Sequence, residues 1–265
     1  MSKINHLGKI IAIFTSLSFF CVGAETIESN NEILKRIQEK GTITIGTEGT
    51  YAPFSYHDES GKLTGYDVEV ARAVAKKLGV QVDFKETQWD AMLAGLNSKR
   101  FDLVANQVSL TSPERQKKYD TTSPYSYSGA VVVARSENSI NSWKSLKGLK
   151  SAQSLTSNYV KLVEQNGAEA IGVDGLAQAL QLVAQKRVDV TINDRLAVLD
   201  FLKKQPSVGL KIVLQNDQRV SSGFVFNKGN QNSIVLFDEA LKELREEGVL
   251  KRLGEQFFGE DVSVQ

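Results

Sequence analysis

Arg115 carries a side chain suited to binding a carboxylate. Its guanidinium can donate two parallel, charge-assisted hydrogen bonds to one carboxylate. A site for an α-amino acid needs such a donor fork, facing an anionic group that takes the ammonium. However, Arg115 stands in the charged run Glu114 to Lys118, so the residues alone favour an exposed surface arginine.

Asp194 and the segment 156–159 both stand where a helix is expected to begin. Asp194 follows a strand-like segment at 188–192, which makes it a good N-cap and also places it at the edge where an open α/β sheet binds ligands. The segment Thr156-Ser157-Asn158-Tyr159 opens another helix, whose free N–H groups could hold a carboxylate. For both, the simpler alternative is a helix cap that touches no ligand.

The composition argues against several other functions. The 265 residues include 32 Lys plus Arg and 31 Asp plus Glu, a net charge of +1, so there is no basic excess to bind a nucleic-acid backbone. With 41% hydrophobic and 24% charged residues, the chain has the composition of an ordinary globular protein. Neither disorder nor a polytopic membrane protein fits it.

Residues 1–24 have the pattern of a secretory signal peptide. Lys3 and Lys9 precede the apolar run Ile10 to Val22, which is too short to span a bilayer comfortably, and Val22-Gly23-Ala24 supplies small residues at a cleavage site. We expect export to the periplasm with cleavage after Ala24. The alternatives are a membrane anchor and a lipoprotein acylated at Cys21, although the two Phe before Cys21 do not resemble a lipobox.

Cleavage there would leave 241 residues with 30 basic and 31 acidic side chains, a net charge of −1. This mature chain would contain no cysteine and a single histidine, His57, in a polar run expected to form a hairpin turn. Cysteine nucleophiles and zinc sites are therefore excluded, and we expect neither a metal nor a cofactor.

Helical and strand-like segments alternate along the mature chain, which predicts two α/β lobes, each with a mainly parallel sheet flanked by helices. Helices are expected at 31–40, 66–78, 91–99, 158–166, 176–185, 194–204, 234–247 and 249–257, and strands at 42–47, 81–85, 101–108, 130–134, 188–192 and 211–214. A crossing strand is expected at 223–227, and a hairpin around Gly61. Because there is no flexible linker, two crossing strands should join lobe one (25–129 and 224–265) to lobe two (130–223), with a ligand cleft between them.

The segment from Gly65 to Leu78, GYDVEVARAVAKKL, resembles the signature of the bacterial extracellular solute-binding proteins of the polar amino-acid family, which serve ABC importers. The likeness extends from Ile33 to Gly259. Within the family, the chain is most similar to the L-cystine-binding members. The segments that carry this finer likeness are Thr47–Phe54, Trp89–Leu93, Asn106–Val108, Glu114–Asp120 and Asp194–Ala197.

The resemblance implies ligand-binding roles for Arg115 and Asp194, and the chemistry of eight other residues extends this set. Arg115 would hold the ligand carboxylate, with help from Thr156, Ser157 and Asn158, and Asp194 would take the ammonium. The methylene and sulfur atoms of the ligand would pack against Tyr51, Phe54 and Trp89, since aromatic rings pack well against sulfur. For Phe54, a place in the core is an equal alternative. Glu48 would lie near the ammonium or the ligand's second polar half, and Ser109 would add a hydroxyl or backbone contact. The loop before Arg115 is one residue longer than is usual in the family.

The resemblance also implies the two-lobe periplasmic-binding-protein fold. We expect a monomer that binds L-cystine between the lobes and delivers it to the transmembrane subunits of an ABC permease. The alternatives are another polar amino acid (Gln, His or Arg) or an enzyme similar to cyclohexadienyl dehydratase, for which Glu48 would be the candidate general acid. We expect no enzymatic activity, because the sequence shows no evident acid/base pair.

Overall fold

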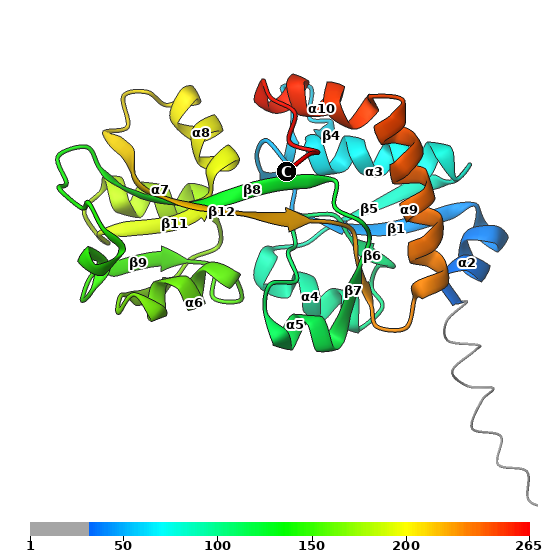
Figure 1. Ribbon diagram of the computed structural model, residues 1–265, viewed down its shortest axis with the longest axis horizontal. Helices are drawn as coiled ribbons and strands as arrows, with labels where there is room; N and C mark the ends of the chain where they lie inside the picture. Colours follow the sequence, from blue (N-terminus) through cyan, green and yellow to red (C-terminus); the bar gives the residue numbers. More distant parts are fainter. Residues whose placement is uncertain (1–31) are drawn as a thin grey trace, which may run out of the picture.

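The structure is a computed structural model, and it describes residues 32–265. The predicted signal peptide at 1–24, with Cys21, lies outside the described residues. The described chain forms two lobes side by side, each built on a five-stranded sheet with helices packed against it (Figure 1). This is the two-lobe α/β architecture that the alternation of helical and strand-like segments predicts. However, the prediction of mainly parallel sheets was wrong: each sheet has two parallel and two antiparallel strand pairs, because the chain crosses between the lobes and pairs antiparallel there.

The first lobe is built on the sheet β5-β1-β6-β13-β7. β1 pairs in parallel with β5 and β6, whereas β13 pairs antiparallel with β6 and β7. The strands are β1 (Thr42–Thr47), β5 (Gln81–Glu86), β6 (Leu103–Val104), β7 (Tyr119–Thr121) and β13 (Val225–Asn227), and the helices are α2 (Glu32–Lys40), α3 (Tyr66–Lys77), α4 (Trp89–Asn97), α5 (Pro113–Lys118), α9 (Gln231–Glu246) and α10 (Val249–Phe258). The hairpin expected around Gly61 is present as β3 (Ser55–His57) and β4 (Leu63–Thr64), beside β2 (Thr50–Tyr51).

The second lobe is built on the sheet β10-β9-β11-β8-β12. β9 pairs in parallel with β10 and β11, and β8 runs antiparallel between β11 and β12. Its strands are β8 (Ser126–Arg135), β9 (Lys150–Gln153), β10 (Glu169–Gly172), β11 (Val190–Asp194) and β12 (Leu210–Ser222), and its helices are η1 (Trp143–Leu146), α6 (Asn158–Gln165), α7 (Leu176–Ala184) and α8 (Arg195–Lys204).

The pattern of α3 shows why the family-like segment folds as it does. Val70 and Val74 lie one helical turn apart and are fully buried, as the four-residue spacing predicts. Gly65 precedes the helix at φ 120°, and a Cβ there would lie 2.4 Å from the carbonyl oxygen of Phe54. Only glycine fits at this position, so it sets the start of α3 against the hairpin.

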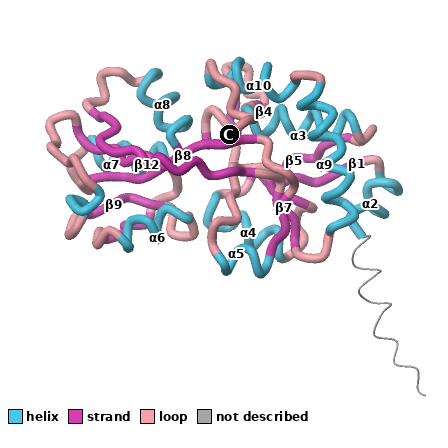
Figure 2. Tube along the Cα trace, in the orientation of Figure 1, coloured by secondary structure: helices cyan, strands magenta, loops and turns pink. Residues whose placement is uncertain are grey.

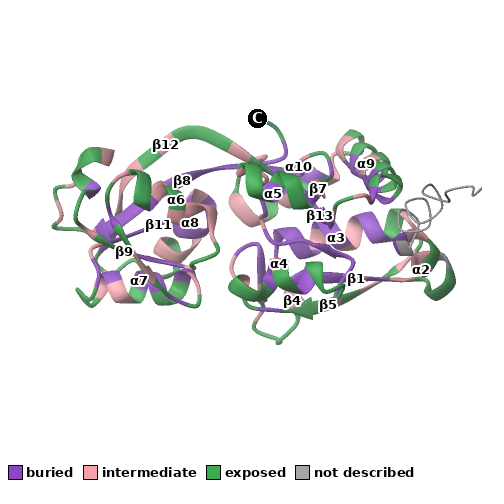
Figure 3. Cartoon of the chain, turned by 90° about the horizontal axis from the view of Figure 1, so that it is seen from below, coloured by how far each residue is buried: buried purple, intermediate pink, exposed green. Residues whose placement is uncertain are grey.

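Two long strands, β8 and β12, connect the lobes (Figure 2). Their pairing extends from Ser126↔Ser222 in the first lobe to Arg135↔Leu210 in the second. β8 is buried along nearly all its length, whereas β12 is exposed or half-buried except at its two ends (Figure 3). The predicted lobe boundaries at 129/130 and 223/224 fall within β8 and just beyond β12.

Several strand predictions were wrong in their place or extent. The crossing strand expected at 223–227 is instead β13 of the first sheet, and β12 makes the crossing. β12 was predicted only at 211–214, because its exposed residues lack the alternation of a half-buried strand. The strand expected at 101–108 pairs only at Leu103–Val104, since the chain then leaves the sheet towards the space between the lobes.

The C-terminal tail after α10 packs back onto the crossing strands. Val262 is fully buried, and its carbonyl oxygen accepts a hydrogen bond of 2.8 Å from the N–H of Tyr127 on β8. Glu260 forms an ion pair with Arg195 of the second lobe. The tail therefore adds a further contact between the lobes. None of the helices within 32–265 is long and apolar enough to cross a membrane.

Candidate functional site

A cavity of about 630 Å³ lies between the two lobes. Eight of the ten predicted ligand-binding residues line it: Glu48, Tyr51, Trp89, Ser109, Arg115, Ser157, Asn158 and Asp194. The other two, Phe54 and Thr156, do not. The floor is formed by the crossing strands, through Ser128 to Ala130 of β8 and Val220 and Ser222 of β12. The cavity is thus assembled from segments that are far apart in the sequence.

Arg115 is buried within an otherwise exposed charged run. Its side chain is only 8% exposed, while Glu114, Lys117 and Lys118 are exposed, so the alternative of a surface arginine is wrong. Ser112 caps α5 by accepting a hydrogen bond of 3.2 Å from the Arg115 N–H. The short helix therefore turns Arg115 towards the cavity, which Pro113 in its first turn also lines, while Glu114, Lys117 and Lys118 do not line it.

The Arg115 guanidinium is held by carbonyl groups. Nη1 donates to the Ser109 carbonyl at 3.1 Å and Nη2 to the Thr156 carbonyl at 2.9 Å, and the Trp89 ring lies 5.5 Å from its central carbon. Among the described residues no carboxylate lies within salt-bridge distance of it. Burial lowers the pKa of Arg115 to about 10. The group remains a cation at neutral pH, and its charge is desolvated without a countercharge.

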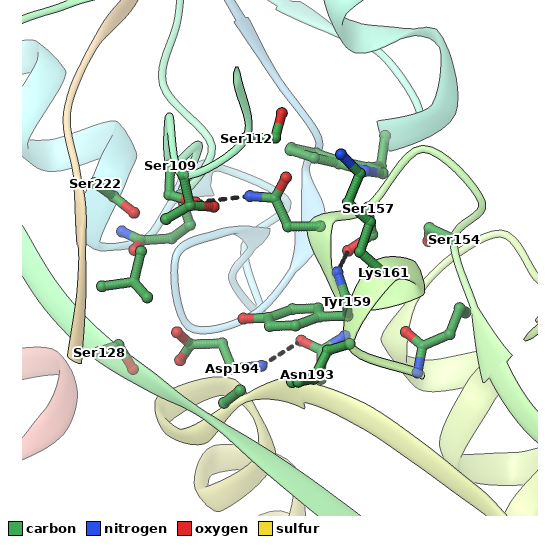
Figure 4. Close-up of a pocket in the computed structure, with 18 of the residues that line it drawn as sticks. Ser109, Ser112, Ser128, Ser154, Ser157, Tyr159, Lys161, Asn193, Asp194 and Ser222 are labelled. Atoms are coloured by element: carbon green, nitrogen blue, oxygen red, sulfur yellow. Dashed lines mark hydrogen bonds between the residues drawn. The ribbon is translucent and has the colours of Figure 1, made fainter. Parts of the chain in front are cut away.

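Asp194 is both a helix cap and a cavity-lining residue. It ends β11 and caps α8, with Oδ1 accepting from the N–H groups of Leu196 at 2.8 Å and Ala197 at 3.4 Å. It also lines the cavity, and its carboxylate points into it (Figure 4). Burial raises the pKa of Asp194 to about 6. Within the described residues, no cation lies within salt-bridge distance of this carboxylate.

Glu48 adds a second acidic group to the cavity. It follows β1, and its Oε2 accepts a hydrogen bond of 3.1 Å from Nδ2 of Asn106. The Asn106 side chain also accepts from the Glu48 N–H at 2.8 Å, so the two residues are locked together. Burial raises the pKa of Glu48 to about 7, with a further contribution from the charge of Asp90.

Aromatic residues form part of the walls. Tyr51 donates a hydrogen bond of 2.7 Å to Oδ1 of Asn193, which joins the two lobes across the cavity. Trp89 is the first residue of α4, and its ring faces the cavity beside Arg115. Phe54 does not reach the cavity: it is fully buried in the core, with its ring 5.3 Å from those of Tyr51 and Phe258. Its fully buried position supports the core alternative.

The start of α6 contacts the first lobe directly. Asn158 donates a hydrogen bond of 2.7 Å from Nδ2 to the Ser109 hydroxyl (Figure 4). The Ser157 hydroxyl caps the helix by accepting from the Tyr159 N–H at 3.2 Å. Thr156 instead turns its N–H and hydroxyl to Asp90, outside the cavity. Its N–H is therefore already bonded and is not among the groups facing the cavity.

Several cavity residues were assigned no side-chain role from the sequence. They include Asn106, Gln107, Gln153, Tyr159 and Asn193. Asn106 and Gln107 lie in a segment that resembles the family, which was a usable signal. The side chains of Gln153, Tyr159 and Asn193 gave no signal in the sequence. An isolated polar residue beside a strand or helix end is as typical of an ordinary protein surface as of a binding site. No group of His, Cys, Asp and Glu within residues 32–265 could hold a metal ion.

Comparison with known proteins gives a consistent result. The family "Bacterial extracellular solute-binding proteins, family 3" matches residues 43–260. The chain is 50% identical over 256 residues to a probable amino-acid ABC transporter-binding protein of Haemophilus influenzae, covering 96% of this chain and 99% of the relative. It is 52% identical over 236 residues to the L-cystine-binding protein TcyA of Bacillus subtilis, covering 88% and 87%.

A solved structure with high identity is the L-cystine solute receptor of Neisseria gonorrhoeae in the unliganded open conformation. It is 60% identical, the match covers 88% of this chain and 99% of the receptor, and the TM-score is 0.60. The family match spans both sheets and nearly every residue of the cavity. The chain therefore belongs to the family 3 bacterial extracellular solute-binding proteins.

Proposed function

We propose that this protein binds L-cystine in the cavity between its lobes and delivers it to an ABC permease in the membrane. One observation carries the amino-acid part of the proposal. Arg115 on the first lobe and Asp194 on the second are both buried in the cavity wall, and neither has an opposite charge within salt-bridge distance in the described part of the chain. The carboxylate and ammonium of one α-amino acid would neutralise both charges.

The proposed roles follow from this arrangement. Arg115 would hold the ligand carboxylate, because two of its five N–H donors are engaged by carbonyls and the others remain for an acceptor. Asp194 would take the ammonium through the oxygen that does not cap α8. Ser109, Ser157 and Asn158 would surround the carboxylate, and Tyr51 and Trp89 would pack against the apolar part of the ligand.

The choice of cystine rests on size, polarity and relatives. Cystine has two amino-acid head groups joined by a disulfide, so it needs a long cavity with polar groups at both ends. The volume of about 630 Å³ is in the range of sites for drug-sized ligands. Glu48 and Gln153 supply polar groups beyond the Arg115–Asp194 pair. Relatives at 52% and 60% identity are named as cystine binders.

Enzymatic activity is not part of the proposal. A dehydratase needs a general acid, and Glu48 is the cavity acid whose pKa of about 7 would suit that task. However, Glu48 is hydrogen-bonded to Asn106, and the cavity pairs charges of opposite sign across two lobes, as a zwitterion requires. We infer that the protein binds its ligand without converting it.

The remaining parts of the proposal concern the protein in the cell. We propose that it is exported, cleaved after Ala24 and active as a monomer in the periplasm. Lobe one would comprise 25–129 and 224–265, and lobe two 130–223. Ligand contacts to both lobes would favour the closed arrangement, which would then dock on the permease.

Calorimetry with L-cystine, Gln, His and Arg tests the proposed ligand. We expect cystine to bind at least tenfold more tightly than each of the other three. If Gln, His or Arg ranks above cystine, the cystine assignment is wrong and only amino-acid binding remains. Incubation with prephenate and arogenate, followed by product detection, tests the enzymatic alternative; turnover of either compound would contradict the inference of binding alone.

A further inference from the structure

Thr156 lies in the turn between β9 and α6, and it directs its polar groups at the opposite lobe. Its N–H and its hydroxyl both donate to Oδ1 of Asp90, at 3.0 and 2.7 Å. Its carbonyl accepts from Nη2 of Arg115 at 2.9 Å. One residue of the second lobe is thus bound through three hydrogen bonds to two side chains of the first.

Asp90 and Trp89 share the first turn of α4, and together they control the surroundings of Arg115. The Trp89 ring packs on the guanidinium, while Asp90 holds the turn whose carbonyl bonds to the same guanidinium. Asp90 and Thr156 do not line the cavity themselves. Apart from the effect of its charge on Glu48, Asp90 can therefore influence a ligand through Thr156 and Arg115.

We propose that Asp90 is a positioning residue for ligand binding, an inference that rests on the proposed function. When the lobes close, its carboxylate captures the N–H and hydroxyl of Thr156. This contact holds the Thr156 carbonyl against Arg115, which fixes the plane of the guanidinium towards the ligand carboxylate. The bonds join the two lobes, so they exist only while the lobes are together.

A neighbouring contact provides a matched comparison. Glu114 and Lys161 also join the lobes at this rim, with 2.8 Å between Oε2 and Nζ, and both side chains are exposed. This ion pair touches neither Thr156 nor the guanidinium. Exposed ion pairs contribute little in general, so its removal should leave the orientation of Arg115 unchanged.

The experiment compares Asp90→Ala, Asp90→Asn, Thr156→Val and Glu114→Gln with the wild type, using L-cystine as the probe. Stopped-flow fluorescence follows binding, with Trp143→Phe as the background so that Trp89 is the remaining tryptophan. We expect Asp90→Ala to raise the dissociation rate about fivefold, with little change in the association rate or in the melting temperature without ligand. Asp90→Asn should be milder, because its amide oxygen still accepts a hydrogen bond. Glu114→Gln should change the dissociation rate by less than twofold.

Thr156→Val removes the hydroxyl and keeps the N–H, so it tests the hydrogen bond from the Thr156 hydroxyl to Asp90 directly. In the Asp90→Ala background, Thr156→Val should have no further effect, since the acceptor is already gone. Additive effects of the two changes would overturn the proposal. A dissociation rate for Asp90→Ala within twofold of wild type, or a lowered melting temperature without ligand, would overturn it as well. If wild-type protein fails to bind cystine, the proposed function fails instead.

Discussion

At the scale of single residues, the main feature of this protein is that buried charges are left without partners of their own. Arg115, Asp194 and Glu48 are each at most 9% exposed, yet within 32–265 none of them forms a salt bridge. Burial of an unpaired charge opposes folding. Such an arrangement is expected where a ligand supplies the missing charges. Two predictions about single residues follow from it.

Replacing Arg115 with Met, or Asp194 with Asn, should weaken ligand binding by about 2–5 kcal/mol each, because the opposing ligand charge is left desolvated and unpaired. Met keeps much of the apolar stem of Arg115, and Asn keeps an oxygen that can cap α8. Calorimetry with cystine measures the loss, and the melting temperature without ligand serves as the control for folding. Binding within threefold of wild type in both variants would show that neither charge contacts the ligand.

Replacing Glu48 with Gln should stabilise the unliganded protein at alkaline pH. Burial raises the pKa of Glu48 from 4.5 to about 7, so the folded protein holds this proton more tightly than the unfolded chain. The associated stability is complete below about pH 4.5 and is lost as the pH rises through 7. Because Gln cannot ionise, the Glu48→Gln variant does not lose this stability as the pH rises.

Urea unfolding at pH 4.5 and pH 8 measures the effect. Relative to wild type, the free energy of unfolding of Glu48→Gln should rise between these pH values by about 1–3 kcal/mol. The other buried acids titrate in both proteins, so the difference isolates Glu48. An equal pH dependence of the two proteins would mean that Glu48 is not desolvated in the unliganded state.

At the scale of elements, short segments aim the functional side chains. α5 is only six residues long, but its cap at Ser112 turns Arg115 inward while its neighbours stay exposed. β11 ends at Asp194 so that one carboxylate caps a helix and faces the cavity. The first turn of α4 carries both Trp89 and Asp90. In each case the position within the element sets the direction of the side chain.

The tail after α10 depends on a close approach at Gly254. A Cβ at this position would lie 2.8 Å from the carbonyl oxygen of Glu260 and 3.1 Å from the amide nitrogen of Val262. Gly254→Ala should therefore displace the tail and destabilise the protein by about 1–3 kcal/mol, although Ala favours a helix over Gly by about 1 kcal/mol. The exposed Gln256→Ala on the same helix is the control. Thermal unfolding of the two variants measures the difference. An unchanged or raised melting temperature for Gly254→Ala would show that the position of the tail does not depend on a glycine at 254.

At the scale of the whole molecule, contacts from three regions join the lobes around the cavity. Tyr51 bonds to Asn193, Asn158 bonds to Ser109, and Glu260 pairs with Arg195. The lobes are also joined covalently through β8 and β12, which run from one lobe to the other. A ligand that touches both lobes adds to these contacts and so favours closure.

The export prediction also belongs to the whole molecule. Mass spectrometry of the protein recovered from the periplasm should show Glu25 as the N-terminal residue, because small residues precede it at the cleavage site. A mature N-terminus at a diacylglycerol-modified Cys21 would instead make the protein a membrane-anchored lipoprotein.

Most of the architecture was predictable from local patterns. Amphipathic periodicity located α3, α6, α7 and α10 to within one residue at each end, because α3, α6 and α7 bury one face against a sheet and α10 buries one against α3 and α9. The family-like segment implied the two lobes, and Arg115 and Asp194 were placed in the cleft by that likeness. Local patterns failed at β12, where the residues between the two buried ends are exposed or half-buried without regular alternation.

The contacts between the lobes were beyond the reach of local patterns. Periodicity reports whether a residue faces its own sheet, but it carries no information about which distant residue lies opposite. Phe54 and Tyr51 are three residues apart, yet one lies in the core and the other bonds to Asn193 in the second lobe. Thr156 was predicted to face the ligand and instead bonds to Asp90, which lies 66 residues away in the chain. The sequence by itself thus determined the fold class and the charged side chains available for a site. The tertiary structure decided which residues face each other across the cleft, because β8 and β12 set how the two lobes come together.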